Sequence, residues 1–167
     1  DLAFSYLVHQ LPHAAHLALS LTVGINYSFE NGEPNGCQRT VQVVEQQSAL
    51  LKQAIEGKNG IFPCDLKNKG DLNQVILVGH SRAGYDIFEV ADQTELLGIQ
   101  GLISAAPSLV SPLSGAPVDV PAGIIIPQYD GDVTSLDGGT LFDQLENTSQ
   151  RSSGTDLIYL ENGNHGG

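Results

Sequence analysis

The chain has 167 residues, a length that allows one domain with a substantial core and leaves little room for two. Its 7 basic and 19 acidic residues give a formal net charge of −12, which argues against nucleic acid and anionic membranes as partners, because their phosphates would be repelled. No apolar run approaches the roughly 20 residues that cross a bilayer, and no basic and then apolar leader opens the sequence. Since Met is absent, we expect a processed or partial chain that forms one globular domain over residues 1–167.

The first predicted elements are short strands separated by one helix. Phe4 to Val8 and Leu21 to Tyr27 are apolar strand candidates, and Pro12 is suited to open a short helix between them. Thr40 is a plausible N-cap for the next helix, whose apolar face repeats at helical spacing until Gly57 can end it. The chain thus begins with alternating strands and helices.

The second half continues this alternation. Val75 to Val78 is an apolar, β-branched run that is typical of a buried parallel strand, and apolar residues at helical spacing follow it. Three more apolar segments predict strands: "GLISAAP", "GIIIPQY" and "DLIYLEN". The stretch "TLFDQLE" predicts a short amphipathic helix, whereas Pro107 to Pro121 shows no helical pattern. We therefore predict an α/β fold with a mostly parallel sheet of about six strands and helices on both faces.

A sharp corner joins the Val75 strand to the next helix. Gly79, Ser81 and Ala83 have the G-x-S-x-G spacing of a nucleophile elbow, with Ala in place of the second Gly and Gly84 one position later. A serine at such a corner takes a strained backbone conformation that projects its hydroxyl above the sheet, and bulky neighbours would collide with the adjacent elements. The pattern points to Ser81 as a nucleophile.

Other glycine-rich corners fit less well. A phosphate loop needs G-x-x-x-x-G-K-[ST], but Tyr85 stands where Lys is required. A dinucleotide loop needs G-x-G-x-x-G, but Ser81 stands at the second glycine. A merely structural turn is the remaining alternative.

The segment "VILVGHSRAG" resembles the elbow of the α/β-hydrolase family, close to the "GHSxGG" variant of cutinase-like and polyester-cleaving hydrolases and other esterases. This resemblance implies an acid after a later strand and a histidine after the last one. Both are present, because two aspartates follow "GIIIPQY" and His165 follows "DLIYLENGN". Relative to larger members of that family, the first two strands and the C-terminal helix are expected to be missing.

The resemblance also implies roles for these residues. His165 would be the general base, and an aspartate would orient its imidazole. Family members usually carry this acid a few residues past the strand and just before a small apolar residue, so we favour Asp132, which precedes Val133. Asp130 and Asp137 remain as alternatives.

Backbone N–H groups should stabilise the negative oxygen of the tetrahedral intermediate. By family resemblance one belongs to Arg82, and the other to Leu11 in "VHQLPH", which is similar to an "HGxxG" loop. His80 is expected to brace the elbow.

Two possible metal sites are disfavoured by their residues. Three histidines near the start have the spacing of one helical face: His9, His13 and His16. Pro12 would interrupt any helix through His9, which disfavours a metal site there. Asp130 and Asp132 fit the first and third positions of a calcium loop, yet Ser135 replaces the required Gly and Leu141 the required Glu. The family needs no metal or organic cofactor, and we expect none.

Cys37 and Cys64 flank the predicted helix that begins after Thr40. They could form a bridge, which would favour an oxidising compartment, or remain two thiols. With the acidic charge, a bridge would favour a secreted protein, and a cytoplasmic one is the alternative. The sequence leaves the oligomeric state open.

We therefore predict a serine carboxylic ester hydrolase, of the esterase or lipase type, that works through an acyl-enzyme with Ser81, Asp132 and His165. Its substrate would be a small-molecule, lipid or polyester ester. A lactone, thioester or amide hydrolase would use the same residues, and a non-catalytic binding module with a hydrolase fold is the alternative of a different class.

Overall fold

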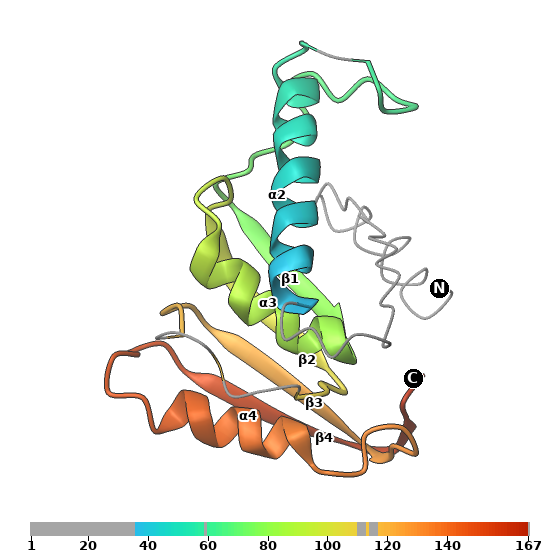
Figure 1. The fold of residues 1–167 in the computed structure, drawn as a ribbon, viewed down its shortest axis with the longest axis vertical. Helices are drawn as coiled ribbons and strands as arrows, with labels where there is room; N and C mark the ends of the chain where they lie inside the picture. The colour runs from blue at the N-terminus through green and yellow to red at the C-terminus, as the bar shows by residue number, and fades with distance from the viewer. Residues whose placement is uncertain (1–35, 59, 110–112, 114–116, 167) are drawn as a thin grey trace.

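A computed structural model describes residues 36–58, 60–109, 113 and 117–166 (Figure 1). Its elements alternate between helix and strand, as the sequence predicts. They are α2 (Gly36–Ile55), β1 (Val75–His80), α3 (Arg82–Gln93), β2 (Ile99–Ala105), β3 (Ala122–Tyr129), α4 (Asp137–Glu146) and β4 (Thr155–Asn164). Side chains are described from residue 38 onward.

The strands form one sheet of 4 strands in the order β1-β2-β3-β4, and every neighbouring pair is parallel. The register aligns Val78 with Ile103, and Ile125 with Ile158. Because all strands run the same way, their carboxyl ends lie at one edge of the sheet. The loops after β1, β3 and β4 therefore meet at this edge, which is where open parallel sheets carry their sites.

All described helices lie on one side of the sheet (Figure 1). Helix α3 packs on β1 and β2, α4 packs on β3 and β4, and α2 packs on α3. Side chains from both helices that touch the sheet share one buried core, which includes Phe88 of α3, Leu102 and Ile124 of the strands, and Leu141 of α4. Burial of this apolar surface is the main force that holds the helices on the sheet.

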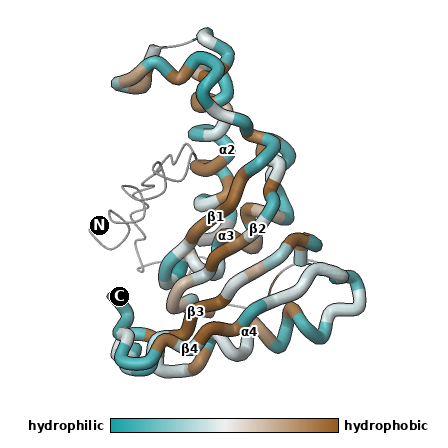
Figure 2. The backbone as a smooth tube through the Cα atoms, turned by 180° about the vertical axis from the view of Figure 1, so that it is seen from behind, coloured by the Kyte–Doolittle hydropathy of each residue, from teal (hydrophilic) through white to brown (hydrophobic). Residues whose placement is uncertain are grey.

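The strands are rich in apolar residues (Figure 2), and several of these residues are exposed on the face of the sheet opposite the helices. Side chains alternate between faces along a strand, so residues next to the buried ones point away from the helices. The exposed apolar residues on this face include Ile76, Val78, Ile103, Ile158 and Leu160. The prediction of a fully buried β1 therefore holds on one side only, because no described helix covers the other.

Helix α2 begins earlier than predicted. It starts at Gly36, so Thr40 lies inside it and is not its N-cap. The Thr40 hydroxyl instead donates a 2.6 Å hydrogen bond to Asp86 Oδ2 in the buried contact with α3. Gly57 ends the helix as predicted, with φ 73° and an N–H that donates to the carbonyl of Ala54.

The predicted sheet differs from the observed one in extent. Four of the six predicted strands are confirmed, while Phe4 to Val8 and Leu21 to Tyr27 lie outside the described residues, as does the helix expected from Pro12. Helix α4 begins at Asp137, earlier than the predicted "TLFDQLE". Within the described ranges, helices cover one face instead of both, and none is long and apolar enough to span a membrane. Cys64 is a free, exposed thiol, and the side chain of Cys37 lies outside the described ones.

Candidate active site at the carboxyl edge of the sheet

Ser81 has the strained backbone expected of a nucleophile elbow. It lies between the end of β1 and the start of α3 with φ 58° and ψ −124°, a conformation that residues with a side chain rarely adopt. Its N–H donates to the carbonyl of Ala105 at 2.9 Å, and its own carbonyl accepts from the N–H groups of Gly84 at 2.9 Å and Ser108 at 3.1 Å. These three bonds hold the corner against its strain.

Glycines make this corner possible. A Cβ on Gly79 would lie 2.1 Å from the carbonyl oxygen of Ala83, well inside van der Waals contact. A Cβ on Gly84 would lie 3.0 Å from Ser104 Oγ, which donates to the Gly84 carbonyl. Ala83 is exposed, so its methyl group meets no neighbouring element. The replacement of the second motif glycine by alanine is therefore sterically harmless.

His165 lies at the same edge, just after β4, and contacts two aspartates from one loop. We call Asp130 to Leu136, which follows β3, the acid loop. Asp130 Oδ1 and Oδ2 are each 2.9 Å from Nδ1 of His165, while Asp132 Oδ2 is 3.4 Å from its Nε2. The imidazole side chain is 18% exposed, that of Asp130 8% and that of Asp132 77%. The structure therefore places Asp130, the alternative to Asp132, on the nitrogen that an orienting acid contacts.

Asp130 is held as a carboxylate by its surroundings. Burial alone would raise the pKa of Asp130, but hydrogen bonds from His165 and from the backbone N–H groups of Val133 and Asp132 outweigh it, so the pKa lies below its ordinary value. The two backbone bonds measure 2.8 Å and 3.0 Å. A carboxylate only accepts hydrogen bonds, so it favours the imidazole tautomer that carries its proton on Nδ1.

Asp137, which directly follows the acid loop, has a different environment. Asp137 Oδ2 accepts a 2.8 Å bond from the N–H of Leu109, and Oδ1 accepts a 2.6 Å bond from Ser135 Oγ. It is also the first residue of α4, where a negative charge is favourable. These contacts support a structural role, in which Asp137 ties the loop after β2 to α4.

The imidazole lies beside the elbow. The ring of His80, which directly precedes Ser81, is 4.7 Å from the ring of His165 between centroids. Within the described part of the chain no hydrogen bond joins the Ser81 hydroxyl to His165, whose Nε2 instead faces Asp132. Catalytic hydrogen bonds are often long before substrate binds. Because Asp132 is 77% exposed, its side chain can rotate away from Nε2 into solvent.

The remaining predicted site residues divide between described and undescribed parts. Arg82 is the first residue of α3, directly after Ser81, as an oxyanion donor must be. Leu11 lies outside the described residues, and so do three histidines: His9, His13 and His16. Among the residues that are described, no group of three or more His, Cys, Asp or Glu side chains is arranged to hold a metal ion.

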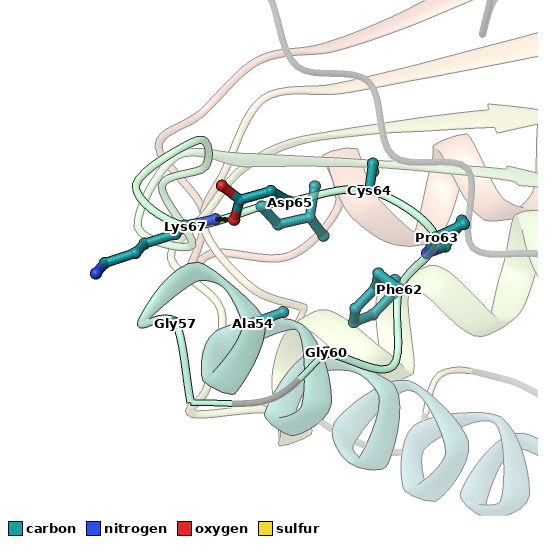
Figure 3. A pocket seen from close by; sticks show the side chains of 9 residues that line it. Ala54, Gly57, Gly60, Phe62, Pro63, Cys64, Asp65 and Lys67 are labelled. Carbon is teal, nitrogen blue, oxygen red and sulfur yellow. Dashed lines mark hydrogen bonds between the residues drawn. The ribbon is translucent and has the colours of Figure 1, made fainter.

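A cavity of about 380 Å³ lies elsewhere, between the end of α2 and the segment from Gly60 to Lys67 (Figure 3). Its lining includes Phe62, Cys64 and Leu66 but none of Ser81, Asp130 and His165. Its lining contains no histidine, and its charged residues are Asp65 and Lys67. The cavity is therefore separate from the group of residues at the carboxyl edge of the sheet.

No family model matches the chain, and no curated protein matches it in sequence. Solved structures with a similar fold include a protein of unknown function from Agrobacterium tumefaciens that is described as an α/β hydrolase, at 15% identity and a TM-score of 0.54. A YdeN-like hydrolase from Pectobacterium atrosepticum matches at 16% identity and a TM-score of 0.56, and esterase PE8 at 15% and 0.53.

These matches cover 87%, 96% and 83% of this chain, respectively, which itself spans 58%, 69% and 60% of theirs. At such low identity they establish the fold, and the chain has the α/β-hydrolase architecture that its elbow predicts. They do not single out a cutinase-like or polyester-cleaving subgroup, which stays a prediction.

The sequence-based prediction ranked Asp130 behind Asp132. The position of Asp130 directly after Tyr129, at the end of β3, was a signal in the sequence for its contact with His165.

Proposed function

We propose that the chain is a serine hydrolase that cleaves carboxylic esters through an acyl-enzyme. The observation that carries this proposal is that the strained Ser81 and a His165–Asp130 pair lie at the same carboxyl edge of a parallel sheet. A hydroxyl alone is a weak nucleophile, and a base oriented by a third group is the arrangement that activates it. The hydrolase and esterase names of proteins with this fold are consistent with the proposal.

In the proposed mechanism, Ser81 Oγ attacks the ester carbonyl while Nε2 of His165 takes the hydroxyl proton. Asp130 keeps Nδ1 protonated and stabilises the imidazolium that forms. The tetrahedral oxyanion accepts hydrogen bonds from the backbone N–H groups of Arg82 and Leu11. Collapse expels the alcohol, which receives the proton from Nε2, and leaves the acyl group on Ser81. Water, deprotonated by the same imidazole, then releases the acid and restores the serine.

Asp132 has a separate part in this proposal. A hydrogen bond between its carboxylate and Nε2 of His165, which lie 3.4 Å apart, would need a proton on that nitrogen, whereas the proposed base needs the same nitrogen free. In the neutral form two lone pairs would face each other, and the exposed Asp132 would turn toward water. The sequence-based preference for Asp132 as the orienting acid is therefore replaced, in the proposed mechanism, by Asp130.

Active-site labelling tests the nucleophile. A fluorophosphonate should form one adduct on the folded protein, and peptide mass mapping should place it on Ser81. Ser81→Ala should abolish labelling and His165→Ala should slow it by a factor on the order of 10³ or more. Ser108→Ala is the matched control, because it removes a neighbouring serine whose backbone contacts the same corner, and it should label normally. No adduct on folded wild type would favour the binding-module alternative.

Substrate class needs a second experiment. Initial rates would be compared on p-nitrophenyl esters, on thioesters, on lactones and on anilides, and we expect the highest rate for the esters. Because the same triad can attack all four classes, differences among their rates would report on the pocket. A series of acyl-chain lengths and a polyester film would then separate small-molecule, lipid and polymer substrates. Faster cleavage of lactones or thioesters would move the proposal to that class without changing the residues.

A further inference from the structure

His80 connects the elbow to the loop that carries the base. It is the last residue of β1, directly before Ser81, and its half-buried side chain lies on the sheet face without described helices. Its ring and that of His165 are 4.7 Å apart and inclined by 51°. The Nε2 atom of His80 also makes a hydrogen bond with the backbone carbonyl of His165. A carbonyl oxygen only accepts, so Nε2 of His80 must be the donor.

This bond joins parts of the fold that the sheet keeps apart. Among the described strands, β1 and β4 lie at the two ends of the order, with β2 and β3 between them. In Figure 1 the chain turns back after β4 toward the ends of the other strands. The ring contact and the hydrogen bond place the end of this turn against His80. Without a contact of this kind, nothing in the strand order brings residue 165 to residue 81.

The base loop, which we define as Asn162 to Gly166, contains the last three residues of β4 and is joined to β3 before it reaches His165. The Asn162 N–H donates to Gln128 Oε1 at 2.8 Å, and Asn164 pairs with Tyr129. Residues 156–162 of β4 are exposed, and Asn162 has φ 60°. A further bond, from the Gly166 N–H to Asn164 Oδ1 at 2.9 Å, supports the turn around His165. Asp130 holds the imidazole through Nδ1 but does not contact the His165 backbone. Among the contacts of the described residues, the bond from His80 is the one that reaches the His165 carbonyl itself.

We propose that His80 is a positioning residue, whose Nε2–H donates to the His165 carbonyl and so fixes the base loop where the imidazole can reach Ser81. The inference rests on the proposed function for the roles of Ser81 and His165. Asp130 orients the ring and His80 places its backbone, so the base is held at two points. Correct placement of reacting groups accounts for large rate factors, and a displacement of about 1 Å can cost about 100-fold.

Three variants separate the hydrogen bond from general packing. His80→Leu removes the donor while it keeps apolar bulk, and His80→Gln provides an amide N–H at a similar distance from the backbone. Val78→Ala, two residues earlier on the same exposed face of β1, is the matched control. For each, hydrogen exchange by mass spectrometry would follow residues 160–166, and the second-order rate of fluorophosphonate labelling would follow the reaction of Ser81.

We expect His80→Leu to speed exchange in the base loop at least tenfold and to slow labelling roughly 10- to 100-fold. His80→Gln should restore both to within a few-fold of wild type, and Val78→Ala should change neither. Unchanged loop exchange in a folded His80→Leu would overturn the inference, and so would a His80→Gln protein as impaired as His80→Leu. Exchange decides the matter even if wild type fails to label, an outcome that would count against the proposed function alone.

Discussion

The elbow around Ser81 and the acid loop lie at the same edge of the sheet but are specified differently. The elbow is shaped by local features, because Gly79 leaves room for the carbonyl of Ala83 and the backbone bends sharply at one residue; bonds to Ala105 and Ser108 then hold it. The acid loop offers Asp130 and Asp132 within three residues, and either could serve from local sequence alone. Their contacts with His165, a distant residue in the chain, distinguish them. A corner can thus be encoded by sterics, whereas a choice between like groups requires a distant partner.

The sharpest test of this comparison replaces each of the two aspartates by asparagine in turn. Asp130→Asn should slow fluorophosphonate labelling of Ser81 by a factor on the order of 10³, because the amide no longer stabilises the imidazolium and can present an N–H to Nδ1. Asp132→Asn, its matched control two residues away, should change the rate by less than about tenfold. If Asp132→Asn were the slower protein, the orienting acid would be Asp132 and the contact at Nδ1 would be a resting arrangement.

The elbow should fail for a steric reason. Gly79→Ala places a Cβ about 2.1 Å from the Ala83 carbonyl oxygen, so the free energy of unfolding should fall by about 3 kcal/mol or more. Gly139→Ala in α4 is the control, because a Cβ there meets nothing within 4 Å, and it should stay within about 1 kcal/mol of wild type. Denaturant titration measures both. Equal stabilities would mean that the corner relaxes and is less tightly encoded than proposed.

The hydrogen bond between Asp130 of the acid loop and His165 should make the stability of the protein depend on pH. Since the pKa of Asp130 is lowered in the folded protein, the unfolded chain binds this proton more readily. The stabilisation is therefore complete above the ordinary carboxyl pKa of about 4 and is lost as the pH falls through the lower folded value. Asp130→Asn should cost roughly 1.5–3 kcal/mol at neutral pH, with a difference from wild type that shrinks in acid. A difference independent of pH would contradict an ionised, hydrogen-bonded Asp130.

The smallest effect is expected at the third aspartate. Asp137→Ala removes the acceptors for Leu109 N–H and Ser135 Oγ, so stability should fall by roughly 1–2 kcal/mol. Labelling of Ser81 should remain within about threefold of wild type, because Asp137 contacts neither His165 nor the elbow. Thermal melts and labelling rates on the same samples provide both values. A rate loss as large as that of Asp130→Asn would place Asp137 in the reaction.

Several features of the fold follow from the sequence because they depend on near neighbours. The alternation of elements, the strand from Val75, the helix after Ser81 and the end of α2 at Gly57 are all confirmed. Each rests on periodicity, β-branching or a glycine conformation within a few residues. The predicted start of α2 is wrong, because the Thr40 hydroxyl donates its hydrogen bond to Asp86 of α3 and does not cap α2. A polar residue with a distant partner need not cap a helix.

The sequence by itself determined the elbow, the parallel α/β pattern and the order along the chain of Ser81, the two aspartates after β3 and His165, because steric fit and periodicity act locally. Only the tertiary structure decided that Asp130 contacts Nδ1 of His165 and that His80 holds the His165 backbone. Both contacts join residues on different strands, and β4 reaches the elbow only through the turn that follows it. Spacing along a chain carries no information on such distances, since they depend on how the whole sheet is ordered and twisted.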